Sequence, residues 1–225
     1  MNHSNFRCDL YLIRHGQSES NAEPGLIAGS DFDSNLTAKG EEQAKRLGAR
    51  LAAEGVEFDR IYSSSYVRAV RTARIMAMAM GTPGARMPPV HALREHEAPC
   101  SWRGKRTEEV LTPEYLALSA AKGSDFKEHS GEGLREAERR VSVWLEDELI
   151  YNPELVSRPV SMKVAIVGHG TATRCLLRYI VGFDQRMIWR MWLDNCSISR
   201  FRFDCQGWSL ISINDSVHSA ELRSD

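Results

Sequence analysis

Two histidines and two arginines of this chain lie in sequence contexts that suit a pocket for a phosphoryl group. Arg14 and His15 open the stretch R-H-G-Q-S-E-S-N, directly after the apolar run at residues 10–13. His169 lies in V-G-H-G after a second apolar run, and Arg68 lies in S-S-S-Y-V-R-A-V-R. Arginine can bind phosphate oxygens in a bidentate manner, and a neutral imidazole can attack phosphorus. The pattern indicates an enzyme that transfers phosphate through a phosphohistidine.

Each of these residues also has an ordinary structural interpretation. A histidine such as His15 or His169 commonly belongs to a core or a surface, and Arg68 can be a solvated arginine. However, Arg68 falls in the first turn of an expected helix, where the macrodipole disfavours a cation by some tenths of a kcal/mol. A bound dianion would reverse that effect. Arg71 and Arg74, further along the same helix, are expected at the surface.

The elements that must position these residues follow from alternating strand and helix patterns. Strand patterns are expected at residues 8–13, 58–62, 162–167, 198–203 and 208–213. Helix patterns follow Thr37 and the serines at 63–65, which are expected to cap them, begin again at residue 134, and cover residues 171–181. Such alternation is typical of βαβ units and predicts an α/β fold with a mainly parallel sheet.

The candidate residues fall where such a sheet binds ligands. Arg14, His15 and His169 each follow an expected strand, and open α/β sheets bind ligands beyond the carboxyl ends of their strands. Gly170 opens the helix expected over residues 171–181. Free N–H groups at a helix N-terminus favour a phosphate, so we expect phosphate binding at Gly170 as well.

Length, charge and cysteine content limit the class of protein. The 225 residues suffice for one α/β domain with a substantial core, so a single domain over residues 1–225 is expected. A formal net charge of -1 and a pI of about 6.7 provide no basic field for nucleic acid or membrane. Five cysteines, an odd number without a C-x-x-C pair, favour a reducing compartment. No signal-peptide or membrane-spanning pattern is found, so a cytoplasmic location is expected.

The periodic pattern breaks down over about residues 82–132. Prolines at positions 83, 88, 89, 99 and 113 predict a long connection with only short helical pieces. We expect this inserted region to face the substrate and to select it.

Taken as a set, the motifs resemble the histidine phosphatase superfamily, which includes phosphoglycerate mutase-like phosphatases. The matching stretches, in chain order, are L-I-R-H-G-Q-S-E-S-N, N-L-T-A-K-G-E-E-Q-A, I-Y-S-S-S-Y-V-R-A-V-R-T-A, L-R-E, G-E-G, V-G-H-G and N-C-S-I. The resemblance implies a three-layer αβα sandwich around a mainly parallel mixed sheet.

The same resemblance implies individual roles. His15 would be the catalytic nucleophile, and Glu95 in L-R-E would donate a proton to the departing alcohol. His169 would be protonated and would assist catalysis. The phosphoryl group would be held by Arg14, Asn21, Arg68 and His169, in addition to the expected contact at Gly170. Because the cationic side chains neutralise the phosphate, the reaction needs no metal and no cofactor.

The segment around the acid departs from the family pattern. It reads E-H-E-A-P-C-S-W-R-G-K-R, with Pro99 where relatives carry glycine and Trp102 one position late. Glu97 therefore stays an alternative to Glu95 as the proton donor.

Three functions stay open, with a phosphatase favoured. The mutases of the family grip phosphoglycerate with a W-R-R-S type basic motif, whereas this chain has only Arg103 and Arg106 nearby. We expect a phosphomonoesterase for a small phosphorylated metabolite. A phosphoglycerate mutase and a catalytically silent phosphate-binding module are the alternatives, and a homo-oligomer is one alternative for the assembly.

Overall fold

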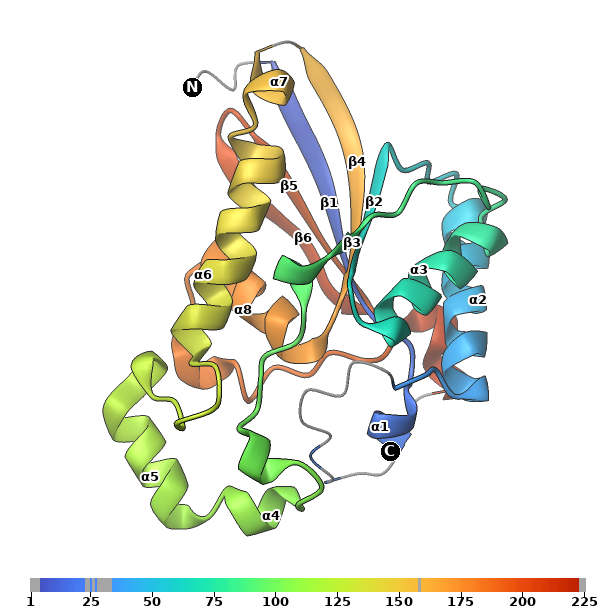
Figure 1. Cartoon of the computed structure of the whole chain (residues 1–225). Coiled ribbons are helices and arrows are strands. Elements are labelled where there is room, and N and C mark those ends of the chain that lie inside the picture. The colour runs from blue at the N-terminus through green and yellow to red at the C-terminus, as the bar shows by residue number, and fades with distance from the viewer. Residues whose placement is uncertain (1–4, 23–24, 26, 28–33, 158, 223–225) are drawn as a thin grey trace.

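A six-stranded mixed sheet forms the centre of the computed structural model, which describes residues 5–22, 25, 27, 34–157 and 159–222 (Figure 1). Its strand order is β3-β2-β4-β1-β5-β6. The strands are β1 (Phe6–Arg14), β2 (Arg60–Ser64), β3 (Pro89–Val90), β4 (Val160–Gly168), β5 (Ile198–Asp204) and β6 (Gly207–Asp215). Neighbours from β3 to β1 run parallel, whereas β5 and β6 join antiparallel. The expected mainly parallel sheet is confirmed.

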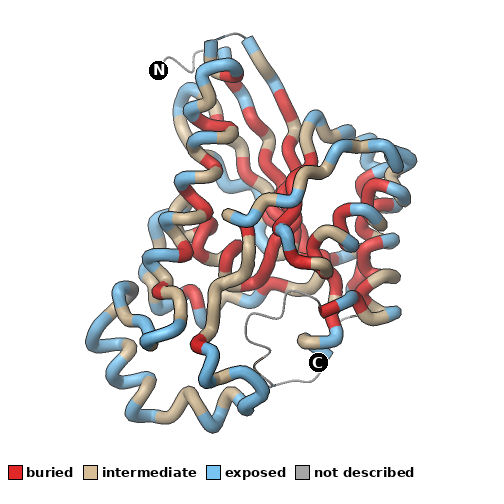
Figure 2. The backbone as a smooth tube through the Cα atoms, in the orientation of Figure 1, coloured by how far each residue is buried: buried red, intermediate tan, exposed pale blue. Residues whose placement is uncertain are grey.

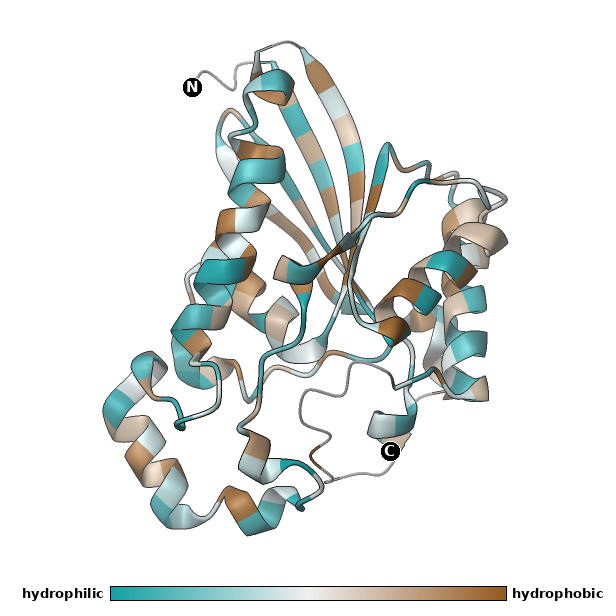
Figure 3. Ribbon diagram, in the orientation of Figure 1, coloured by the Kyte–Doolittle hydropathy of each residue, from teal (hydrophilic) through white to brown (hydrophobic). Residues whose placement is uncertain are grey.

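Helices cover both faces of the sheet, as Figure 1 shows. One layer contains α2 (Ala38–Ala53) and α3 (Val67–Ala79), and the other contains α6 (Leu134–Leu145) and α8 (Gly170–Val181). Each layer encloses its own cluster of buried apolar side chains against the sheet. Figure 3 shows the hydrophobic residues as bands along the strands and helices. The three-layer αβα sandwich expected from the sequence is confirmed.

Local sequence signals explain where several elements begin and end. The Thr37 hydroxyl accepts the Gly40 N–H at 3.1 Å and caps the N-terminus of α2. Gly182 ends α8 in the left-handed conformation, with φ of 77°. Strand β4 lies between β1 and β2, and its alternate residues pack into the two core clusters, Val164 and Ile166 on one face and Ala165 and Val167 on the other, which explains its nearly continuous apolar sequence.

The strand β2 and the start of α3 differ from expectation. Strand β2 covers Arg60–Ser64 rather than residues 58–62, because it pairs with β4 from Arg60 to Ser63. Two of the three serines expected to cap the helix are therefore buried strand residues. Helix α3 instead begins after Tyr66, without a side-chain cap.

The inserted region is built from short pieces, as expected. It contains β3, 3₁₀ turns at His91–Leu93, Cys100–Trp102 and Gly123–Asp125, and the helices α4 (Thr107–Val110) and α5 (Pro113–Lys122). The half-buried rings of Trp102, Tyr115 and Phe126 pack edge to face and hold these pieces together. Figure 2 shows α4 and α5 largely exposed, in contrast to β1 and β4.

The remaining elements are small. They are α1 (Glu19–Ala22), a π-helical turn at Glu146–Ile150 that continues α6, α7 (Pro153–Val156), and 3₁₀ turns at Gln185–Met187 and Val217–Leu222. None of the helices in the described ranges has the length and apolarity needed to cross a bilayer.

Candidate functional site

His15 lies immediately beyond the carboxyl end of β1, where hydrogen bonds from β4 and from the segment that precedes β5 hold its backbone. Its N–H donates to the Gly168 carbonyl of β4 at 2.9 Å. Its own carbonyl accepts the side-chain amide of Asn195 at 2.9 Å. The Cys196 N–H donates to the carbonyl of Arg14 at 3.0 Å. The segment that precedes β5 therefore fixes the backbone of His15.

The imidazole of His15 is buried and neutral. Its Nδ1 lies 2.6 Å from the Gly16 carbonyl, which can only accept, so Nδ1 carries the proton. Its Nε2 lies 3.2 Å from Nε of Arg68 and accepts a hydrogen bond from it. Burial, followed by the charges of Arg68 and Arg14, holds the pKa of His15 well below its ordinary value. The backbone carbonyl thus selects the tautomer whose Nε2 lone pair is available.

Arg68 is part of this buried cluster rather than a solvated arginine. It is the second residue of α3 and is 6% exposed, whereas Arg71 and Arg74 on the same helix are exposed as expected. The Thr72 hydroxyl donates to the Arg68 carbonyl at 2.7 Å and accepts the Gly16 N–H at 3.0 Å. Thr72 therefore joins α3 to the turn that follows His15.

His169 faces His15 from the N-terminus of α8. The two ring centroids are 5.1 Å apart, and Nε2 of His169 lies 2.7 Å from the Ser64 hydroxyl. Its Nδ1 is buried and has no hydrogen-bond partner within the described part of the chain. Burial, followed by the charges of His15 and Arg68, holds the pKa of His169 well below its ordinary value. The structure therefore favours a neutral His169, which differs from the protonated His169 expected from the sequence.

Arg14 supplies the second cation. One of its terminal nitrogens, Nη1, donates to the Leu193 carbonyl, and its Nε is buried without a partner in the ranges described. Burial lowers the pKa of Arg14 to about 10, with a further contribution from Arg174 and an opposing one from Glu95. Arg14 therefore stays charged at neutral pH, close to both the acid and the histidines.

Glu95 reaches the N-terminus of α8. Its carboxylate accepts N–H groups from Ala172 at 2.8 Å, His96 at 2.8 Å and Thr171 at 3.1 Å. A Cβ on Gly170 would lie 3.7 Å from Oε2 of Glu95 and 3.6 Å from Nε of Arg14, which are ordinary van der Waals distances, so Gly170 lies directly beside both groups. The sequence predicts that N–H groups at the N-terminus of α8 bind phosphate. Two of them, those of Thr171 and Ala172, instead bind the carboxylate of Glu95.

Glu97, the alternative acid, points elsewhere. Its carboxylate accepts Nε of Arg94 at 3.2 Å, and its side chain is 35% exposed. Its backbone carbonyl accepts the Glu132 N–H at 2.9 Å. The geometry places Glu95, not Glu97, beside Arg14 and α8.

A buried ion pair that the sequence analysis did not single out supports the Glu95 segment. Arg140 of α6 binds both carboxylate oxygens of Glu132, at 2.7 and 2.6 Å, and both side chains are largely buried. The same guanidinium donates to the carbonyls of Ala92 at 2.7 Å and Arg94 at 3.0 Å. Although burial acts in the opposite direction, the hydrogen bond from Arg140 leaves the pKa of Glu132 below its ordinary value.

Asn21 is the one predicted site residue that the structure does not join to the others. It lies in α1, it is exposed, and in the described part of the chain it bonds only to Ser18. Residues 28–33, which follow this helix, lie outside the described ranges.

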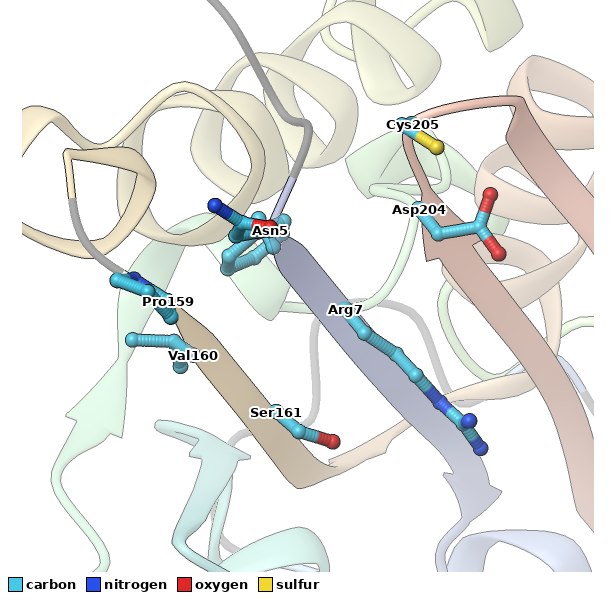
Figure 4. Close-up of a pocket in the computed structure, with 8 residues that line it drawn as sticks. Asn5, Arg7, Pro159, Val160, Ser161, Asp204 and Cys205 are labelled. Atoms are coloured by element: carbon cyan, nitrogen blue, oxygen red, sulfur yellow. The ribbon is translucent and has the colours of Figure 1, made fainter.

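Other parts of the described chain do not resemble a reaction centre. No group of three or more His, Cys, Asp or Glu side chains in the described ranges is placed to hold a metal ion. Figure 4 shows a surface pocket at the amino ends of β1 and β4, lined by Asn5, Arg7, Ser161 and Cys205 among others. Strand β1 has nine residues, so at about 3.3 Å per residue this pocket lies roughly 30 Å from His15.

Comparison with known proteins shows which proteins this chain resembles. A family model described as the histidine phosphatase superfamily, branch 1, matches residues 10–216. The probable phosphoglycerate mutase GpmB of Citrobacter koseri is 34% identical over 220 residues, covering 93% of this chain and 94% of that protein.

Two solved structures share the fold over nearly their whole length. Bacillus stearothermophilus YhfR is 27% identical with a TM-score of 0.76, covering 94% of this chain and 98% of that one. Phosphoserine phosphatase from Entamoeba histolytica, solved with 3-phosphoglyceric acid, is 25% identical with the same TM-score and coverage. With a family match over almost all of its length, this chain belongs to branch 1 of the histidine phosphatase superfamily.

Proposed function

We propose that the chain is a metal-independent phosphomonoesterase that hydrolyses a small phosphorylated metabolite through a phosphohistidine at His15. The observation that carries this proposal is the pair of contacts of its imidazole. The Gly16 carbonyl binds Nδ1–H, and Nε2 is directed at Arg68 in a buried site. A neutral imidazole oriented in this way is a nucleophile that needs no separate base.

In the first step, the Nε2 lone pair of His15 forms a bond to phosphorus while the bond from phosphorus to the ester oxygen breaks. Glu95, in its protonated form, transfers its proton to the departing oxygen, and the alcohol leaves. General acid assistance of this kind contributes about 10²–10⁴-fold. The three N–H groups that hold the carboxyl of Glu95 fix its orientation toward the leaving group.

In the second step, water attacks the phosphorus of the phosphohistidine. Glu95, now a carboxylate, accepts a proton from that water, and the electron pair of the breaking P–N bond returns to Nε2. Inorganic phosphate is released and both residues regain their initial state. One acid therefore serves both half-reactions.

The charge on the equatorial oxygens is met by three groups around His15. Arg68 is a buried cation and Arg14 a partly buried one, and charges shielded from water stabilise a transferring phosphoryl group more strongly than solvated ones. His169, with its ring centroid 5.1 Å from that of His15, has Ser64 on Nε2, and its Nδ1 has no partner among the described residues. A phosphate dianion would favour protonation of His169 when bound.

A phosphoglycerate mutase is the second candidate, favoured by the names of the curated relatives such as the protein of Citrobacter koseri. A mutase must retain the intermediate and rebind the product. The two arginines that follow Glu95 closely, Arg103 and Arg106, are exposed, and Arg94 is engaged by Glu97 and Glu132. These contacts leave the phosphatase as the favoured function.

The test is phosphate release from a panel of phosphomonoesters in EDTA, by wild type, His15→Ala and the control His129→Ala. His129 is an exposed histidine of the inserted region. We expect activity in EDTA that is lost only in His15→Ala, together with acid-labile phosphate on the wild-type protein. Activity that survives in His15→Ala would overturn the nucleophile. Isomerisation of phosphoglycerates without phosphate release would establish the mutase instead.

A further inference from the structure

The loop between α8 and β5 forms one wall of the candidate site. The Leu193 carbonyl in this loop accepts Nη1 of Arg14, and the Asn195 amide binds the His15 carbonyl. Ile188 and Leu193 are each 1% exposed and fix the loop in the hydrophobic core. The loop therefore presents its other side chains from a fixed backbone at the edge of the phosphate pocket.

Trp189 is exposed on this fixed loop. Its side chain follows the buried Ile188 and is 60% exposed, which is costly for so large an apolar ring. The ring still has a defined neighbour, because its centroid lies 6.4 Å from that of His96 at an angle of 79°. His96 in turn is fixed by the contact of its Nε2 with the Glu132 carbonyl at 2.6 Å.

The position of Trp189 relative to the acid identifies which part of a substrate it faces. The His96 N–H binds Oε1 of Glu95, so Trp189, which meets the His96 ring edge to face, contacts the residue that directly follows the proton donor of the proposed reaction. A proton donor must lie at the ester oxygen that departs. The wall formed by Trp189 and His96 is therefore on the leaving-group side of the phosphoryl group.

The geometry points to an aromatic subsite, formed by Trp189 and His96, that binds a flat aromatic ring in the leaving group of the substrate. This inference rests on the proposed phosphatase function and names its substrate class: phosphate esters of alcohols that carry an aromatic or heteroaromatic ring. Such a ring would cover the exposed face of Trp189 and exclude water from Glu95. Aromatic pairs gain stability beyond the area that they bury.

The test compares kcat/KM for benzyl phosphate and 2-methoxyethyl phosphate, whose alcohols have similar acidity but differ in the ring. We expect wild type to prefer the benzyl ester, and Trp189→Ala to lower that preference about tenfold. Trp189→Phe should retain most of it. Inhibition by vanadate, which occupies only the phosphoryl pocket, should be unchanged in both variants. Met78→Ala is the matched control, since Met78 is 67% exposed on α3.

Each contrary result has a distinct meaning. Wild type without a ring preference, or a Trp189→Ala variant that keeps it, would overturn the aromatic subsite while leaving the phosphatase intact. Equal loss on both esters would also overturn it, because Trp189 would then act by positioning His96 and Glu95. If neither ester is hydrolysed in a His15-dependent manner, the proposed function fails and the subsite fails with it.

Discussion

Nε of Arg68 lies 3.2 Å from Nε2 of His15 and donates its hydrogen to that nitrogen. A cation in hydrogen-bond contact with a buried imidazole can persist only while the imidazole is neutral. The contact with Arg68 therefore requires an unprotonated Nε2 on His15. In the proposed reaction, the bond from Nε2 to phosphorus replaces this contact, and the guanidinium of Arg68 then binds the oxygens of the phosphoryl group.

Arg68→Met should slow formation of the phosphohistidine about 10²–10³-fold, because the transferring phosphoryl group loses a buried cation. Rapid alkaline quenching of the first turnover, with labelled substrate, measures that step directly, because a phosphohistidine is stable in alkali and labile in acid. Arg71→Met on the same helix is the control, since Arg71 is exposed and pairs with Glu41 at the surface. An unchanged burst in Arg68→Met would remove Arg68 from the phosphoryl pocket.

Glu95→Gln and Glu97→Gln should separate the two candidate acids. We expect the first substitution to lower turnover of alkyl phosphates about 10²–10⁴-fold, since the amide cannot donate a carboxyl proton. Glu97→Gln should stay near wild type, because its carboxylate contacts Arg94 rather than α8. Steady-state kcat on one alkyl ester decides, and the reverse order of effects would assign the acid to Glu97.

Arg140→Met should impair proton donation by Glu95 and leave the nucleophile His15 intact. Arg140 binds the carbonyls of Ala92 and Arg94, which precede Glu95 in the chain, so its loss should displace the Glu95 carboxyl from the leaving oxygen. We expect about a 10²-fold loss of kcat on alkyl phosphates and a much smaller one on p-nitrophenyl phosphate, whose leaving group needs little protonation. Arg139→Met, at the exposed neighbouring position, should behave as wild type.

The comparison of the two esters is what gives this experiment its meaning. A purely structural role for Arg140 would lower activity on both esters by the same factor, together with the melting temperature. A selective loss on the alkyl ester, with vanadate inhibition retained, identifies Arg140 as a positioning residue for Glu95.

The parts of the site that lie on regular elements were predictable from sequence. The apolar run before Arg14 and the run before His169 each form a strand, and each strand ends where the polar motif begins. Hydrophobic periodicity and the caps at Thr37 and Gly182 are local signals, so they predict element boundaries without knowledge of the tertiary structure.

The parts that depend on contacts distant in sequence were not predictable in this way. Glu95 reaches Thr171 of α8 across 76 positions of sequence, and the Glu132–Arg140 pair that supports it appears in no local pattern. Only family resemblance pointed to Glu95. The local preference of serine predicts that Ser64 caps a helix, whereas it is the last residue of β2, paired with Val90 and buried beside His169.

The buried histidines should make the fold sensitive to mild acid. The pKa values of His15 and His169 are lowered chiefly by burial, and burial likewise lowers that of His218. Below about pH 6.5 the unfolded chain binds protons at these positions and the folded chain does not. The free energy of unfolding must then fall as pH falls, by up to about 1.4 kcal/mol per histidine for each pH unit.

Urea unfolding between pH 5.5 and 7.5 measures this slope in a range where most carboxyl groups do not titrate. His15→Asn should reduce the slope relative to wild type, whereas His129→Asn should not, because His129 is exposed in both states. The slope should vanish above pH 7.5, where all three imidazoles are neutral in both states. Stability that instead rises on acidification would mean that His15 and His169 gain protons on folding, which would contradict the neutral nucleophile on which the proposed reaction depends.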